Sequence, residues 1–168
     1  MPIIKMPAAI ISALCSLCAC NNNDNTLKLQ YKTDSLQSVI DHAYKPGLGE
    51  FMSSIQTHHA KLWFAGMNAN WRLADFEIHE IMESVDDIKI YAAERPESKE
   101  VGMLAPALDT VNNAIVKKDS ALFRQSFIAL TNTCNNCHRS VDYGFNIVTI
   151  PSALPVANQQ FKLPENLK

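Results

Sequence analysis

The stretch SALFRQSFIALTNTCNNCHRS, from Ser120 to Ser140, decides the fold and contains the most informative motif in the chain. Its apolar positions follow the spacing i, i+4, i+7, i+11 and i+14, which is typical of one face of an α-helix. These positions are Phe123, Phe127, Leu130, Cys134 and Cys137. The sequence therefore predicts a helix, capped by Asp119 or Ser120, that turns two cysteines toward a protein core near its C-terminal end.

Three further amphipathic helices precede this one, and the connections between them are short. The first is expected from Gly47 to Met67 and the second from Trp71 to Ala92, with apolar residues at helical spacing in both. The third has an apolar stripe from Val101 to Ile115, in which Pro106 either kinks the helix or marks its start. Four such helices predict an all-α fold, an antiparallel up-and-down four-helix bundle over residues 47–140.

Length and composition limit the class of protein. The chain has 168 residues, of which 47% are hydrophobic and 19% charged, and this suits one globular domain with a single core. The formal net charge of −2 at pH 7 predicts no nucleic-acid partner. Glu77, Glu80 and Glu83 lie off the apolar stripe and are expected on a solvated face, with His58 also at the surface. Because no nucleophile–base pair is recognisable, we expect no independent enzymatic activity.

The first twenty residues have the character of an export signal. Lys5 precedes an apolar run, from Ala8 to Ala19, that is too short to span a bilayer comfortably. The run ends in Leu-Cys-Ala-Cys at positions 17–20, which resembles a bacterial lipobox, so we expect removal of residues 1–19 and lipidation of Cys20. A plain signal peptide cleaved near Cys20 is the alternative. The first reading predicts a periplasmic protein that is tethered to a membrane by its lipid.

The segments on either side of the bundle have a different character. Residues 20–46 are predicted to form a polar tether with a short helix between Ser35 and Tyr44. Residues 141–168 contain three prolines and no helical period. We therefore expect residues 141–168 to form an extended tail that packs across the bundle.

Cys134, Cys137 and His138 form a Cys-x-x-Cys-His motif, which is the sequence signature of c-type haem attachment. Two thiols at this spacing can add to the two vinyl groups of haem, while the adjacent histidine ligates the iron. A redox dithiol would stand at a helix N-terminus after a strand, and a zinc site would need further ligands. Of the five cysteines, three fall in the export signal or at the lipidation position. The motif thus predicts one covalent haem c, with dithiol, zinc and disulfide as weaker alternatives.

A bundle with this motif at the end of its last helix resembles the cytochrome c-prime superfamily, and the resemblance covers Gly47 to Ser140. The stretch HHAKLWFAGMNANWRLADFE, residues 58–77, is also similar to one in small exported c-type cytochromes. The resemblance implies thioether bonds at Cys134 and Cys137, with His138 as the proximal iron ligand. The long segment after His138 departs from the pattern of that family.

The sequence offers more than one candidate for the group that faces His138 across the iron. The resemblance implies either a methionine from the first helix or an open site that binds small gases. Counting the helix rise back from Met67 places Met52 level with Cys134 in an antiparallel bundle, which makes Met52 the candidate distal ligand. His59 lies on the same stripe and is the alternative distal ligand.

Tyr91 and Met103 are expected at the same end of the bundle, as walls of the haem pocket. Together these features predict an exported monohaem c-type cytochrome that transfers electrons between redox proteins, with a homodimer allowed. The alternatives are a five-coordinate haem protein that binds NO or CO, and a haem subunit of a larger redox enzyme.

Overall fold

The computed structural model describes residues 23–167, so the predicted signal peptide and the lipidation position Cys20 lie outside the described residues. The chain divides into two compact units, Met1–Tyr44 and Lys45–Lys168. Within the described residues every regular element is helical, which confirms the prediction of an all-α protein. None of the described helices is both long enough and apolar enough to cross a membrane.

The described part of the first unit is a single helix, α1 (Asn23–Asp41), which is longer than the short helix that the sequence predicts. No proline or glycine occurs between residues 23 and 44. Side chains one turn apart also support the helix, because Gln30 Nε2 donates to Asp34 Oδ1 and Gln37 Nε2 donates to Asp41 Oδ1, each at 2.8 Å. The prediction underestimated this helix because its apolar residues are few and no packed face marks its first half.

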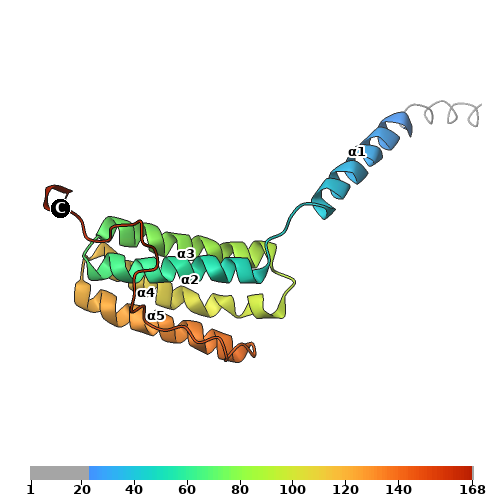
Figure 1. Cartoon of the computed structure of the whole chain (residues 1–168). Coiled ribbons are helices and arrows are strands. Elements are labelled where there is room, and N and C mark those ends of the chain that lie inside the picture. Colours follow the sequence, from blue (N-terminus) through green and yellow to red (C-terminus); the bar gives the residue numbers. More distant parts are fainter. Residues whose placement is uncertain (1–22, 168) are drawn as a thin grey trace, which may run out of the picture. The chain divides into compact units, whose positions relative to one another are not determined.

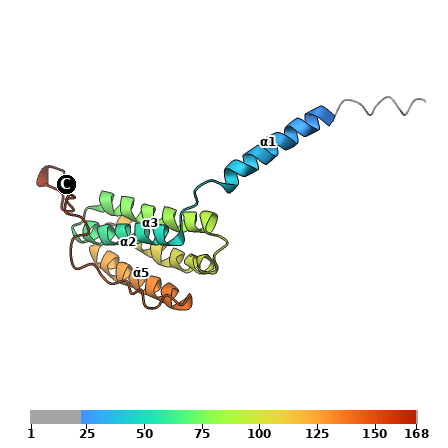
Figure 2. The ribbon, with the colours of Figure 1, turned by 45° about the vertical axis from the view of Figure 1, so that its right-hand side comes forward.

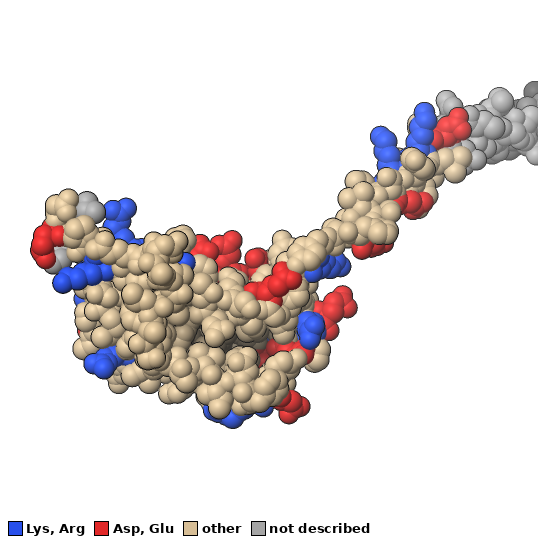
Figure 3. Space-filling model, in the orientation of Figure 1, with Lys and Arg blue, Asp and Glu red and all other residues tan. Residues whose placement is uncertain are grey.

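The second unit contains four long helices that lie side by side (Figures 1 and 2). These are α2 (Leu48–Met67), α3 (Trp71–Tyr91), α4 (Ala105–Val116) and α5 (Ser120–Ser140). Each helix contacts its neighbour in sequence, and α5 contacts α2, so the four enclose one core. Figure 3 shows that charged side chains lie mainly at the margins of one face of this unit, whose centre has few of them.

Capping residues explain where α3, α4 and α5 begin. Asn70 accepts a hydrogen bond from the Leu73 amide at the start of α3. Asp119 Oδ1 accepts two backbone N–H groups, each at 3.0 Å, at the start of α5. Pro106 lies in the first turn of α4, where its missing N–H costs no hydrogen bond, so it marks the start of that helix and does not kink it. Two short 3-10 helices, η2 (Pro96–Lys99) and η3 (Val101–Leu104), connect α3 to α4.

Two phenylalanines of α5 fill the centre of the core. Phe123 and Phe127 are both 0% exposed, and their ring centroids lie 5.9 Å apart. Gly66, in the last turn of α2, is packed directly against Phe123, and a Cβ added at Gly66 would overlap the phenylalanine ring. The end of α2 and the start of α5 therefore approach so closely that only glycine fits between them.

The segment that follows α5 runs back along the bundle without regular secondary structure until a last 3-10 helix, η4 (Glu165–Leu167). Phe161 is buried against Phe64, with ring centroids 5.7 Å apart. The side chain of Asn70 donates to the Phe161 carbonyl at 3.1 Å. These contacts hold the segment at the end of the bundle where α2 turns into α3.

Candidate functional site

Two adjoining cavities, of about 190 and 220 Å³, lie between the first half of α2 and the last turns of α5. Their linings share five residues, which are Gly49, Met52, Cys137, His138 and Asn146. The first cavity is also lined by Cys134 and His59. The structure therefore brings together all the residues that the sequence predicts as thioether, proximal and distal positions.

The thiols of Cys134 and Cys137 are free and sit at the C-terminal end of α5. Burial raises the pKa of Cys134 to about 11, and the neighbouring Cys137 adds to this effect. Burial also raises the pKa of Cys137, with a further contribution from Glu100. Both shifts disfavour the thiolate, which is the form that a dithiol oxidoreductase uses.

His138 has a ring orientation that suits a metal ligand. Its Nδ1 lies 2.6 Å from the carbonyl oxygen of Asn146, and because a carbonyl can only accept, Nδ1 must be the protonated nitrogen. The lone pair is then on Nε2, which has no hydrogen-bond partner among the residues that the structure describes. Histidines that bind metals generally donate the other ring N–H to a carbonyl or carboxylate in this way.

His59 is committed to a hydrogen bond inside the core. Its Nε2 lies 2.9 Å from Thr131 Oγ1, and that hydroxyl donates its single proton to the Phe127 carbonyl at 3.0 Å. His59 Nε2 must therefore be protonated and donate to Thr131, which leaves a lone pair only on Nδ1. The imidazole also packs on the Phe127 ring, with centroids 4.4 Å apart. His59 is therefore a core residue that is held by Thr131 and Phe127. The thioether of Met52, in contrast, lines both cavities.

Burial of His59 makes the stability of the protein depend on pH. Desolvation lowers the pKa of His59 from 6.5 to about 4, so between these values the unfolded chain binds a proton that the folded chain does not. The free energy of unfolding should therefore fall as the pH falls from about 6.5 to about 4, by at most roughly 3 kcal/mol. Urea unfolding across this pH range measures the slope. A His59→Phe variant should show a shallower slope, and an unchanged slope would contradict the assignment.

Tyr91 and Met103, which the sequence predicts as walls of the haem pocket, are not among the residues that line the two cavities. Tyr91 is 53% exposed, because the buried stripe of α3 continues to Ala92 and leaves Tyr91 on its flank. In η3, the three-residue period turns Val101 and Leu104 inward, so Met103 between them is only half-buried. Leu104 takes the place in the first cavity that the sequence assigned to Met103.

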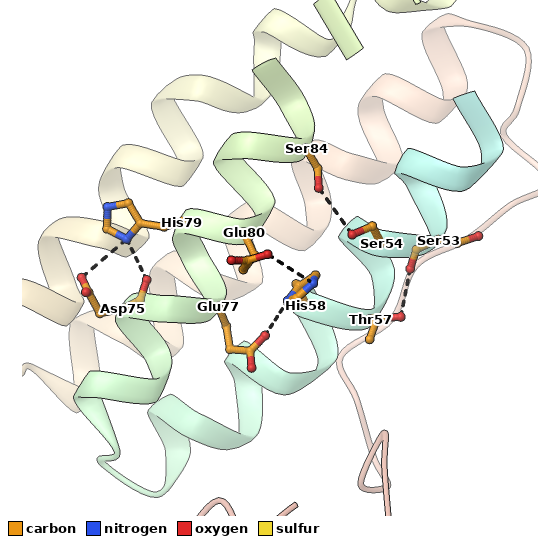
Figure 4. A network of polar contacts seen from close by, with 9 residues as sticks. All are labelled: Ser53, Ser54, Thr57, His58, Asp75, Glu77, His79, Glu80 and Ser84. Carbon is orange, nitrogen blue, oxygen red and sulfur yellow. Dashed lines mark hydrogen bonds and ion pairs between the residues drawn. The ribbon is translucent and has the colours of Figure 1, made fainter. Parts of the chain in front are cut away.

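His58 and Glu77 form a polar pair between α2 and α3, shown in Figure 4. Glu77 is fully buried, and its Oε2 lies 2.6 Å from His58 Nδ1, while its Oε1 has no hydrogen-bond partner among the described residues. Glu80 stands at the rim, 3.9 Å from His58 Nε2 and 35% exposed. The prediction of a solvated face is therefore wrong for Glu77, and His58 is largely covered. The spacing to Ala74 and Ile81, three residues before and four after, was the signal that places Glu77 on the buried side.

Sequence reasoning also missed several other residues that line the cavities. Gly49 borders both cavities, and a Cβ added there would meet no atom within 4 Å, so the site has open space at this point. Asn146 and Val148 come from the segment after α5, and nothing in their residue types indicates a site. Arg95 and Glu97 line the second cavity, where Arg95 Nη2 lies 3.1 Å from Glu97 Oε1.

No protein-family model matches this sequence, and no match was found among curated proteins or among solved structures. Within residues 23–167, no group of three or more His, Cys, Asp or Glu side chains is placed to hold a bare metal ion. A haem iron needs no such group, because the porphyrin supplies four ligands and the protein supplies one or two.

Proposed function

We propose that this chain is an exported c-type cytochrome that carries one covalent haem and transfers single electrons. The observation that carries the proposal is the meeting of three groups in one cavity. The same cavity is lined by Cys134, Cys137 and His138. Both thiols are free, and the hydrogen bond from His138 Nδ1 leaves the lone pair of the neutral ring on Nε2. Each thiol would add its S–H across one haem vinyl group, and His138 Nε2 would ligate the iron.

Other residues that line the two cavities also suit a haem held by Cys134, Cys137 and His138. Met52, from α2, supplies a thioether opposite the motif helix and is our candidate for the sixth ligand. The guanidinium of Arg95 in the second cavity suits a haem carboxylate, because arginine binds carboxylates through several N–H donors. The open space at Gly49 leaves room between α2 and α5. Haem bound here would supply reversible one-electron chemistry, and the protein would set its potential through ligands and burial.

The predicted export signal and the predicted lipidation at Cys20 support a periplasmic location with a lipid tether, since thioether attachment of haem takes place outside the cytoplasm. We assign no reaction to the protein itself, and its partners would be redox proteins. Homodimerisation and a role as subunit of a larger redox enzyme are compatible with this proposal.

Expression together with a c-type haem maturation system tests the proposal. After extraction with heat and acidified organic solvent, the wild-type polypeptide should retain one haem, seen by mass and by optical absorption. A double Cys134→Ala, Cys137→Ala variant should retain none, while the control Met103→Ala, outside the cavities, should retain one. Wild-type protein that retains no haem would overturn the proposal. Appearance of a reversible Cys134–Cys137 disulfide in that protein would favour the dithiol alternative.

A further inference from the structure

The segment after α5 is fastened across the haem-attachment motif by one side chain. Asn135 Nδ2 donates to the Val148 carbonyl at 2.8 Å, and Asn135 Oδ1 accepts from the Val148 amide at 2.8 Å. The amide of Asn135 thus pairs with both backbone groups of one residue, as a neighbouring strand would. These two hydrogen bonds together fix both the position and the rotation of the extended backbone at Val148.

The same stretch of backbone reaches His138. Asn146, two residues before Val148, presents its carbonyl to His138 Nδ1 at 2.6 Å. Asn135 and His138 are three residues apart in α5 and so lie on neighbouring parts of one helix face. Asn135 is therefore linked to the His138 imidazole by the hydrogen bonds at Val148 and Asn146 and the short stretch of backbone between these two residues.

We propose that Asn135 is a positioning residue that sets the tautomer and basicity of the iron-ligating imidazole through the segment 146–148. The inference rests on the proposed function and goes beyond it by giving a role to a variable position inside the Cys-x-x-Cys-His motif. Donation from Nδ1–H to a carbonyl makes the imidazole a stronger electron donor, and this stabilises the ferric state. Loss of the Asn135 amide loosens the carbonyl of Asn146 and weakens that donation.

Two variants test the role of Asn135 in the haem-loaded full chain. Asn135→Ala removes the amide, and Asn135→Leu keeps its approximate volume without any hydrogen-bonding group. The matched control is Asn136→Ala, the other variable position of the motif, which is exposed and whose side chain accepts a hydrogen bond from Arg139 of its own helix. The readouts are the midpoint reduction potential and the exchange of the His138 Nδ1–H proton with D2O, followed by NMR on histidine-labelled protein.

Both Asn135 variants should retain covalent haem, show a midpoint potential shifted to more positive values and exchange the Nδ1–H proton at least tenfold faster. The Asn136→Ala control should match the wild type in both readouts. Unchanged potential and exchange in the two Asn135 variants would overturn the inference and leave the proposed function intact. Failure of both variants to retain haem, with the control retaining it, would also overturn it, because a positioning residue leaves attachment unaffected. Absence of haem from the wild type would instead be a failure of the proposed function.

Discussion

Replacing Met52 with alanine is expected to change the haem-loaded protein from low-spin to high-spin in both oxidation states. Of the two candidate distal ligands on α2, the Met52 thioether and the His59 imidazole, only the imidazole is already hydrogen-bonded in the core. Its loss would leave the iron five-coordinate or bound by a weak ligand, and the reduction potential should fall because methionine ligation raises it. Optical spectra of the oxidised and reduced forms, with and without CO, measure the change.

His59→Gln is the matched control for this experiment, because His59 lines the same cavity and its Nε2 is engaged by Thr131. We expect the control to remain low-spin. A low-spin spectrum that persists in Met52→Ala but is lost in His59→Gln would reassign the sixth ligand to His59. A wild-type protein that is already high-spin and binds CO when reduced would favour the gas-binding alternative over electron transfer.

Replacing Gly66 with alanine is expected to destabilise the second unit by about 1–3 kcal/mol. The added Cβ would overlap the ring of Phe123, a fully buried residue of α5, so α2 and α5 must separate or the ring must leave its rotamer. Thermal and urea unfolding, monitored by circular dichroism, measure the loss of stability.

Gly102→Ala is the matched control, because a Cβ at Gly102 meets no atom within 4 Å. We expect a change within about 0.5 kcal/mol for this surface position. In the background of Phe123→Leu, which shortens the side chain, the cost of Gly66→Ala should shrink. Equal costs in the two backgrounds would show that the strain arises elsewhere than at the Gly66–Phe123 contact.

The four helices of the bundle were predictable from the sequence, because strong apolar periodicity coincides with punctuating residues such as Asp119. The start of α4 was not, because the apolar stripe begins at Val101, in a 3-10 helix that precedes it. The level of Met52 relative to Cys134 was also accessible, since a straight helix has a fixed rise per residue. Both kinds of information are local or follow from helix geometry alone.

The features that sequence reasoning missed depend on tertiary packing. α1 has no buried face in the described part of its unit, so periodicity gave no signal for its full length. Glu77 was assigned to solvent by its charge, although its spacing places it on the buried side. The carbonyl of Asn146 is a backbone group, and no residue type reveals which carbonyl will meet His138.

The hydrogen bond between Asn70 and Phe161 joins residues that are 91 positions apart, whereas successive bundle helices are joined by connections of 3 to 13 residues. Contacts between such distant residues form late, because a long loop must close before they contribute. We therefore expect the bundle helices to associate first and the stretch around Phe161 to dock last. Asn146 and Val148, by contrast, contact residues of α5 only 8 and 13 positions away, so this wall of the candidate site can form together with the end of α5, before the chain reaches Asn70.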